Sequence, residues 1–380
     1  MGSATTQTSN DTSHRLQWTR RGTQNVELVS IILDNLPRGR DLATCLRVNS
    51  FFFTVASAHV YCHVRLFQHG VWKLDLFSVQ PHVCRSGIEH PTAALASRPS
   101  LQNSVHLVDV FEHSTDDCAA IRLDPIHVDT LRVNLRQHKS RAVLHTDLWG
   151  QEGCRALAPI RAKKIIVRGP LVLRDGVIIS HDLAPEALDA AEQVTIVATE
   201  AFSAISDRWF EPLGRSELLR RESSAQNVTF VFWTRKPEER WYPNQPFTYD
   251  HYLSPHWAGR FLKYVAHALV ETWPTGCGVT IVNAGNINGL DLGLENEPGY
   301  EAVQAHLGTR LREEIQRATE FGDEEDAGKR LEGRVKWLTM REYLSTPGWA
   351  GDFGDDEVEP WLKRFEGNKG GCVVNGDRAE

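Results

Sequence analysis

The sequence predicts an α+β fold, in which a short N-terminal unit of three helices precedes an irregular α/β solenoid with parallel strands. Three observations lead to this prediction. Apolar residues in segment 25–66 recur at helical spacing. Short runs rich in β-branched residues recur from residue 105 onward. Helix-like stretches separate the later runs, and strands that alternate with helices are typical of a parallel sheet.

Composition limits the class of protein and its partners. Apolar residues make up 41% of the 380 residues and charged residues 24%, as in ordinary globular proteins. The formal net charge of -7 argues against nucleic acid as a partner, because phosphate contacts require a basic surface. We also expect no membrane partner, because no apolar run approaches the roughly 20 residues that a spanning helix needs.

The seven cysteines are scattered along the chain and form no C-x-x-C pair. Such cysteines are typical of small core residues in a reducing compartment. The Ser/Thr-rich N-terminus lacks the apolar core of a secretory signal. The expected location is therefore cytoplasmic or nuclear.

Changes in composition divide the chain into five segments. The first is expected to be a disordered arm and the second a helical unit. A connector, a repeat-like α/β domain and an acidic, partly flexible tail follow. Their predicted bounds are 1–24, 25–66, 67–104, 105–346 and 347–380.

Segment 25–66 predicts three short helices with tight turns between them. The first begins after Asn25, a good N-cap residue, and ends at Pro37. The second follows Asp41, and the third runs from about Ser50 to Cys62. Helices this short must pack on one another or on a partner, because isolated helices of fewer than about 12 residues are marginal in water.

The β-prone runs predict the strands of the second region. The first five start about 25 to 35 residues apart, which is close to the length of a strand-plus-helix repeat. Two helices are expected over His256–Trp273 and Tyr300–Ala318. A compact doubly wound sheet is the alternative architecture. The solenoid is preferred because no strand is followed by a glycine-rich phosphate turn. The runs start at Val105, Thr130, Lys164, Val194, Val228, Val279 and Val335.

The helical block resembles an F-box. The segment Glu27–Leu36 fits the first helix of that family from its glutamate onward. The pair Asp41-Leu42 and the run from Cys45 to Asn49 follow in family-like order, and Phe52 stands in the third helix. The resemblance covers about 42 residues, and the strands behind them resemble divergent leucine-rich repeats.

The resemblance implies a non-catalytic adaptor that recognises a protein substrate for a cullin–RING ubiquitin ligase. In that family the helices dock onto a Skp-family linker, and large apolar anchors dominate such interfaces. Two other roles stay open: a protein-binding scaffold in which the helices only cap the solenoid, and a small-molecule enzyme on a doubly wound sheet. The residues expected to face the linker are Leu28, Val29, Ile32, Leu33, Leu36, Leu42, Val48 and Phe52.

The sequence offers no catalytic motif, so no catalytic residue, cofactor or metal site is predicted. His59, Cys62 and His63 form an H-x-x-C-H run, but Cys62 and His63 are adjacent on a predicted helix, so their side chains diverge instead of converging on a zinc ion. The turn from Asn283 to Asp291 follows a strand and is interpreted as an ordinary Asn/Gly turn. The enzyme alternative would place a ligand there. The aromatic residues between Trp233 and Trp273 are interpreted as core.

Overall fold

The structure is a computed structural model, and the chain divides into two compact units. One comprises Met1–Arg65 with Trp72–His106, and the other comprises Leu66–Val71 with Leu107–Glu380. The residues that the structure describes are 26–33, 35–36, 41, 44–60, 62–66, 72–74, 103–113, 125–138, 141–143, 154, 157–174, 177–178, 190–203, 225–241, 256–271, 276–294, 298–319, 327–349 and 351–367.

The first unit is helical where the expected helices fall within the described residues. Residues 26–33 form one helix, and α3 spans Ser50–Val60. The backbone of α3 begins at a capped turn, because the Asn49 side chain accepts a hydrogen bond from the Phe52 amide at 2.9 Å. Between the helices, the amides of Arg47 and Val48 donate three residues back, as in a tight turn. The short strands β1 (His63–Leu66) and β2 (Trp72–Leu74) follow.

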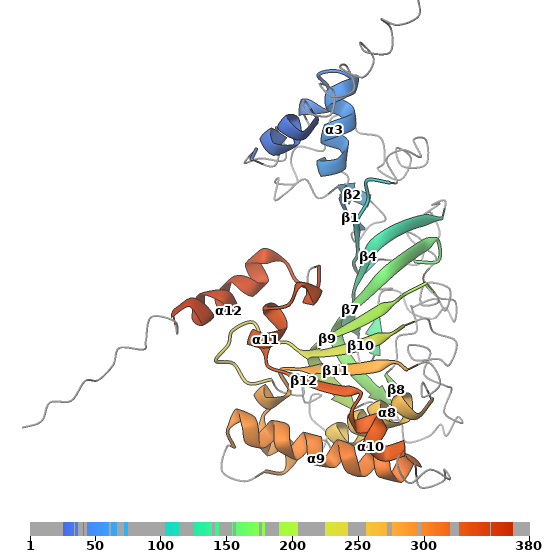
Figure 1. The fold of residues 1–380 in the computed structure, drawn as a ribbon, viewed down its shortest axis with the longest axis vertical. Helices are drawn as coiled ribbons and strands as arrows, with labels where there is room; N and C mark the ends of the chain where they lie inside the picture. Colours follow the sequence, from blue (N-terminus) through green and yellow to red (C-terminus); the bar gives the residue numbers. More distant parts are fainter. Residues whose placement is uncertain are drawn as a thin grey trace, which may run out of the picture. The chain divides into compact units, whose positions relative to one another are not determined.

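The second unit contains a parallel sheet at the positions that the β-prone runs predict. Seven strands pair in parallel in the order β12-β11-β10-β9-β7-β4-β3. Figure 1 shows β4, β7, β9, β10, β11 and β12 one beneath another in chain order. Their bounds are β3 Leu107–Val110, β4 Ile126–Asn134, β7 Ile160–Arg174, β9 Gln193–Ser203, β10 Asn227–Phe232, β11 Gly278–Val282 and β12 Val335–Leu338.

The order of the strands bears on the choice between a solenoid and a doubly wound sheet. Each of these seven strands lies beside its neighbours in the chain, and the order never reverses. A doubly wound sheet requires such a reversal, and its ligand site lies at that point. The parallel α/β character of the second region is therefore confirmed, and the described strands lack the feature that defines the doubly wound alternative.

One minor strand extends this sheet, and two others form a separate two-stranded sheet. β8 (Val177–Ile178) pairs antiparallel with the end of β7, and β5 (Arg136–His138) forms a hairpin with β6 (Arg141–Val143). The register of β7 against β9 shifts at Gly169, whose φ is 139°. A Cβ atom there would lie 2.6 Å from the Leu135 carbonyl oxygen, so only glycine fits this bulge.

Helices α8 (His256–Glu271) and α9 (Tyr300–Thr319) lie where the sequence predicts helices, and α8 packs on one face of the sheet. Phe230 and Phe232 of β10 meet the ring of Phe261 in α8 edge-on, at centroid distances of 5.1 and 5.4 Å. α9 packs against α8, and the buried side chains of α9 recur every four residues along the helix. The short α10 (Ala327–Glu332) precedes β12. The buried side chains of α9 are Val303, Leu307, Leu311 and Ile315.

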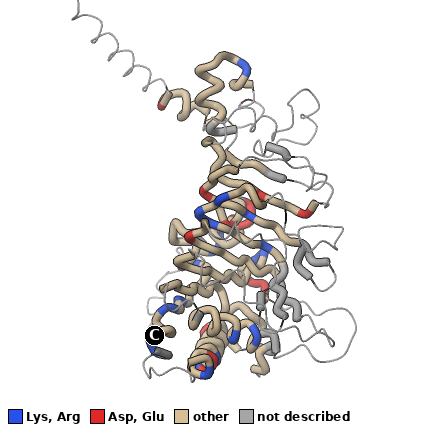
Figure 2. Tube along the Cα trace, turned by 90° about the vertical axis from the view of Figure 1, so that its right-hand side faces the viewer, with Lys and Arg blue, Asp and Glu red and all other residues tan. Residues whose placement is uncertain are grey.

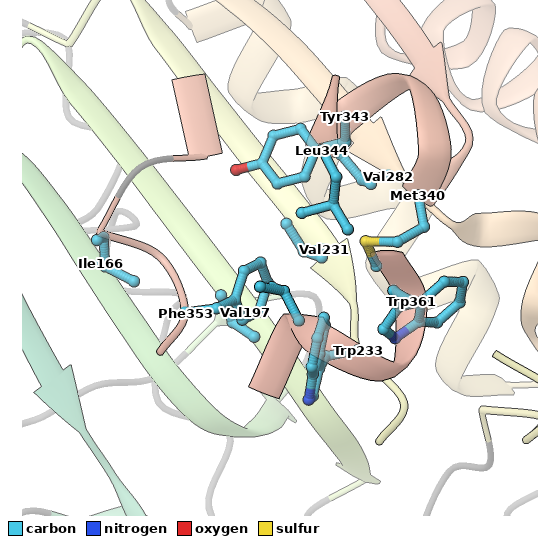
Figure 3. Packing of buried hydrophobic residues seen from close by; sticks show 11 residues of the cluster. Ile166, Val197, Val231, Trp233, Val282, Met340, Tyr343, Leu344, Phe353 and Trp361 are labelled. Carbon is cyan, nitrogen blue, oxygen red and sulfur yellow. The ribbon is translucent and has the colours of Figure 1, made fainter. Parts of the chain in front are cut away.

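The opposite face of the sheet is covered by the end of the described chain. Alternate strand residues point to opposite faces, so Val231 points away from α8 while its neighbours Phe230 and Phe232 point toward it. Val231 belongs to a buried cluster that joins four strands to residues 339–367 (Figure 3). This segment contains α11 Met340–Leu344, η6 Pro347–Trp349 and α12 Asp355–Gly367.

Candidate protein-docking surfaces

The helix over residues 26–33 is apolar on two sides. Leu33 is 2% exposed, so one side faces the interior of the first unit. Leu28, Ile31 and Ile32 are 58%, 58% and 60% exposed on the other side. A helix that is apolar all round is normally covered all round. The described chain therefore leaves one apolar side of this helix without a cover.

Exposed apolar side chains gather in this unit. Six of the seven large apolar side chains that are exposed among the described residues lie between residues 26 and 51. Grouped apolar exposure of this kind marks interaction sites on soluble proteins, whereas scattered exposure does not. We call this set the exposed apolar patch. Its members are Val26, Leu28, Ile31, Ile32, Val48 and Phe51.

The eight residues that were expected to face a linker differ in their exposure. Leu28, Ile32 and Val48 are exposed and belong to the patch. Leu33 is buried, and Leu42 lies outside the described residues. The half-buried members are Val29, Leu36 and Phe52. Val26, Ile31 and Phe51 are patch residues that the sequence analysis did not name among the docking residues.

A second surface lies on the sheet, opposite α8. Its cations come from the two strands β4 and β7, and its apolar residues from β7, β9, β10 and β11. We call it the tail-covered face, because residues 339–367 lie on it. Figure 2 shows basic and acidic positions interspersed along the strands of the second unit. The face comprises Arg132, Lys164, Ile166, Arg168, Val197, Val231 and Val282.

Ion pairs hold the covering segment at the cationic end of this face. Lys164 Nζ lies 2.6 Å from Asp352 Oδ1, and Arg168 pairs with Glu357. Arg132 Nη1 donates to the Gly351 carbonyl oxygen at 3.1 Å. Burial raises the pKa of Asp352, and Lys164 opposes that rise. Burial also disfavours the charge of Glu357, yet the hydrogen bond and charge of Arg168 hold its pKa below the ordinary value.

Arg132 has a second, fully buried partner. Its guanidinium makes two hydrogen bonds with Asp109 of β3, which is 0% exposed. Burial alone would lower the pKa of Arg132, but the hydrogen bonds and charge of Asp109 raise it. Arg132 therefore stays charged inside the unit, next to the covering segment.

Aromatic contacts hold the same segment at the apolar end. Phe353 stacks on Trp233 with ring centroids 4.1 Å apart, and the Arg168 guanidinium lies 5.8 Å from the Phe353 ring. Trp361 Nε1 donates to the Thr234 carbonyl oxygen at 3.1 Å. Figure 3 shows Phe353, Trp233 and Trp361 gathered beside the strands. The acidic tail expected from residue 347 thus packs on the sheet through Phe353, Val358 and Trp361, and Phe365 packs against the same cluster.

The Asn/Gly turn after β11 ties neighbouring loops together. Asn283 has a φ of 62°, and its side-chain amide donates to the Phe232 carbonyl oxygen at 2.8 Å. The Asn286 amide donates to the Glu239 carbonyl oxygen at 2.6 Å. Both amides are engaged within the protein, as the interpretation of an ordinary turn requires. The side chain of Asp291 lies outside the described residues.

Two further groups bear on the enzyme and metal alternatives. His113 Nε2 lies 3.4 Å from Cys154 Sγ, but both side chains are 0% exposed, so this pair is closed to a substrate. Nothing in the described ranges gathers three His, Cys, Asp or Glu side chains that could hold a metal ion. None of the described helices is long and apolar enough to cross a membrane.

The aromatic cluster is core where the structure describes it. Trp233 and Trp241 are 6% and 1% exposed, and Trp241 meets Phe232 edge-on at 4.9 Å. Trp241 Nε1 donates to the Ala198 carbonyl oxygen at 2.9 Å. The interpretation of these two residues as core is confirmed. Trp273 lies outside the described residues.

Comparisons with known proteins return nothing for this chain: no protein-family model, no curated protein and no solved structure matches it.

Proposed function

We propose that this chain is a non-catalytic adaptor whose N-terminal helices dock onto a Skp-family linker of a cullin–RING ubiquitin ligase. The observation that carries the proposal is the exposed apolar patch. Covering it would remove large apolar side chains from water, at about 25 cal/mol for each Å² buried. Large apolar anchors of this kind dominate helix-in-groove interfaces. The F-box resemblance covers the same residues.

We further propose that the sheet that follows these helices in the sequence is a divergent leucine-rich-repeat-like solenoid, and that it binds the substrate protein. Its strands follow chain order, as the stacked units of a solenoid do. A repeated hydrogen bond supports this. Asn134 and Asn283 stand at the ends of β4 and β11, and each donates to the last carbonyl of the preceding strand, at 3.5 Å to Val110 and 2.8 Å to Phe232.

Binding of a purified Skp-family linker to the full chain tests the proposal. We expect the wild-type chain to bind, and the double variant Leu28→Asp with Ile32→Asp to bind at least about a hundredfold more weakly, because two central anchors are lost. Both side chains are exposed, so the variant should fold normally. Isothermal titration calorimetry measures the affinity, and circular dichroism checks the fold.

Leu362→Asp is the matched control, because Leu362 is also an exposed apolar residue but lies on α12 in the other unit. It should bind the linker like the wild type. A wild-type chain that does not bind, or a double variant that binds equally well, would show that the patch has another role.

A further inference from the structure

The covering segment is joined to its sheet face by polar contacts that are unusual for a core. Two of its acids, Asp352 and Glu357, neutralise Lys164 and Arg168 of the adjacent strand β7. Buried ion pairs are often no more stabilising than apolar side chains in the same place, because charged groups lose solvation on burial. Residues 339–367 thus supply the acids that pair with these two cations of the face.

The pairing of this segment with the face is also incomplete. Arg168 Nε is buried without a hydrogen-bond partner among the described residues. Buried polar atoms are nearly always paired, so an exception calls for an explanation. Gly351, with a φ of 84°, and Gly354 lie on either side of Asp352 and Phe353, where the segment makes its first ion pair. The segment is therefore held by specific polar contacts, as a bound peptide would be. It also carries glycines, whose backbone can adopt conformations that other residues cannot.

The contacts define a recognition pattern. An acid, Asp352, is followed directly by an aromatic residue, Phe353, and then by a helix. That helix brings a second acid, Glu357, to Arg168 and an aromatic residue, Trp361, to the Thr234 carbonyl. Complementary charge at one end and aromatic packing at the other fix both the direction and the register of the bound segment.

We propose that residues 349–365 act as an intramolecular ligand of a peptide-binding face, and that a partner protein supplies an acidic–aromatic helical peptide of the same pattern in their place. The inference rests on the proposed adaptor function, since it names the substrate surface and the chemistry of its ligand. The tethered segment competes with such a peptide for the face. Its effective concentration is in the millimolar range, about the value for a short flexible linker. An external peptide therefore binds the wild-type chain weakly.

A fluorescent peptide with the sequence of residues 349–365 is the probe, and fluorescence anisotropy with the full chain is the measurement. The chain variant Asp352→Asn with Glu357→Gln loosens the tethered segment, and we expect it to bind the probe at least about tenfold more tightly than the wild type. The control variant Asp356→Asn with Glu359→Gln removes equal charge from exposed acids of the same segment and should behave like the wild type.

The probe itself carries the reciprocal control. A peptide with Asp352→Asn and Glu357→Gln should bind at least about tenfold more weakly than one with Asp356→Asn and Glu359→Gln, because only the first loses the partners of Lys164 and Arg168. A second measurement uses the unaltered chain, in case the loosened variant does not fold. Saturating probe should speed amide hydrogen exchange of residues 352–361.

Three results would overturn the inference: no binding of the probe to either chain, equal binding of both probe variants, or unchanged exchange of residues 352–361 under saturating probe. Linker binding by the same preparations separates this inference from the proposed function. A chain that binds the linker but not the probe contradicts the peptide-binding face alone. A chain that binds the probe but not the linker contradicts the ligase adaptor and supports the peptide-binding face.

Discussion

Replacing Arg132 by methionine is expected to lower the free energy of unfolding by about 3 to 5 kcal/mol. Asp109 is fully buried and takes two hydrogen bonds from this guanidinium, so the substitution leaves a buried charge without its cation. The contact of Arg132 with the Gly351 carbonyl oxygen is lost as well. Urea denaturation followed by circular dichroism measures the change.

Two controls distinguish loss of the charge partner from loss of packing. The double variant Asp109→Leu with Arg132→Met replaces both charges by apolar groups and should cost much less than Arg132→Met alone. Lys163→Met removes a neighbouring ion pair to Asp129 that is exposed on both sides, so its effect on the free energy of unfolding should be small. An Arg132→Met variant no less stable than Lys163→Met would show that the buried pair contributes little.

Replacing Trp241 by alanine is the second large effect, with an expected loss of about 3 to 5 kcal/mol in the free energy of unfolding. The indole is 1% exposed, packs edge-on against Phe232 and donates to the Ala198 carbonyl oxygen. Trp241→Phe keeps a ring but loses the donor, so it should cost about 1 to 3 kcal/mol. Thermal and urea unfolding of both variants test this order, and an alanine variant as stable as the phenylalanine variant would contradict it.

The strands were predictable because each carries a run of β-branched residues, whose conformational preference is local. All seven runs form strands of one parallel sheet, and the helices over 256–271 and 300–319 fall where they were expected. Strand order was open, because pairing depends on contacts between residues far apart in the chain. The order follows the chain, as a solenoid would require.

The covering segment was not predictable in the same way. The acids of residues 352–359 have the composition of a solvated tail, and an acidic run normally lies in solvent. Their partners are far away in the sequence: Arg168 and Glu357 are 189 residues apart. No local pattern marks Asp352 as buried, since its environment is created by Lys164 and by the strands beneath it.

The docking residues were predictable as a group but not one by one. The density of apolar residues marks segment 25–66. A helix with apolar residues on two opposite sides, however, has no single apolar face, so its sequence does not show which side is buried. Leu33 was expected to face a linker and is buried, whereas Ile31 was not named and is exposed. Only the packing of the unit decides which side of the helix faces solvent.

Amide hydrogen exchange of the full chain, with and without a Skp-family linker, tests the central claim most directly. The adaptor account predicts slower exchange in residues 26–33 and 44–60 when the linker is present, because these backbones carry the exposed apolar patch. Exchange in β7 to β11 should not change. A linker that leaves the exchange of residues 26–60 unchanged would contradict the account.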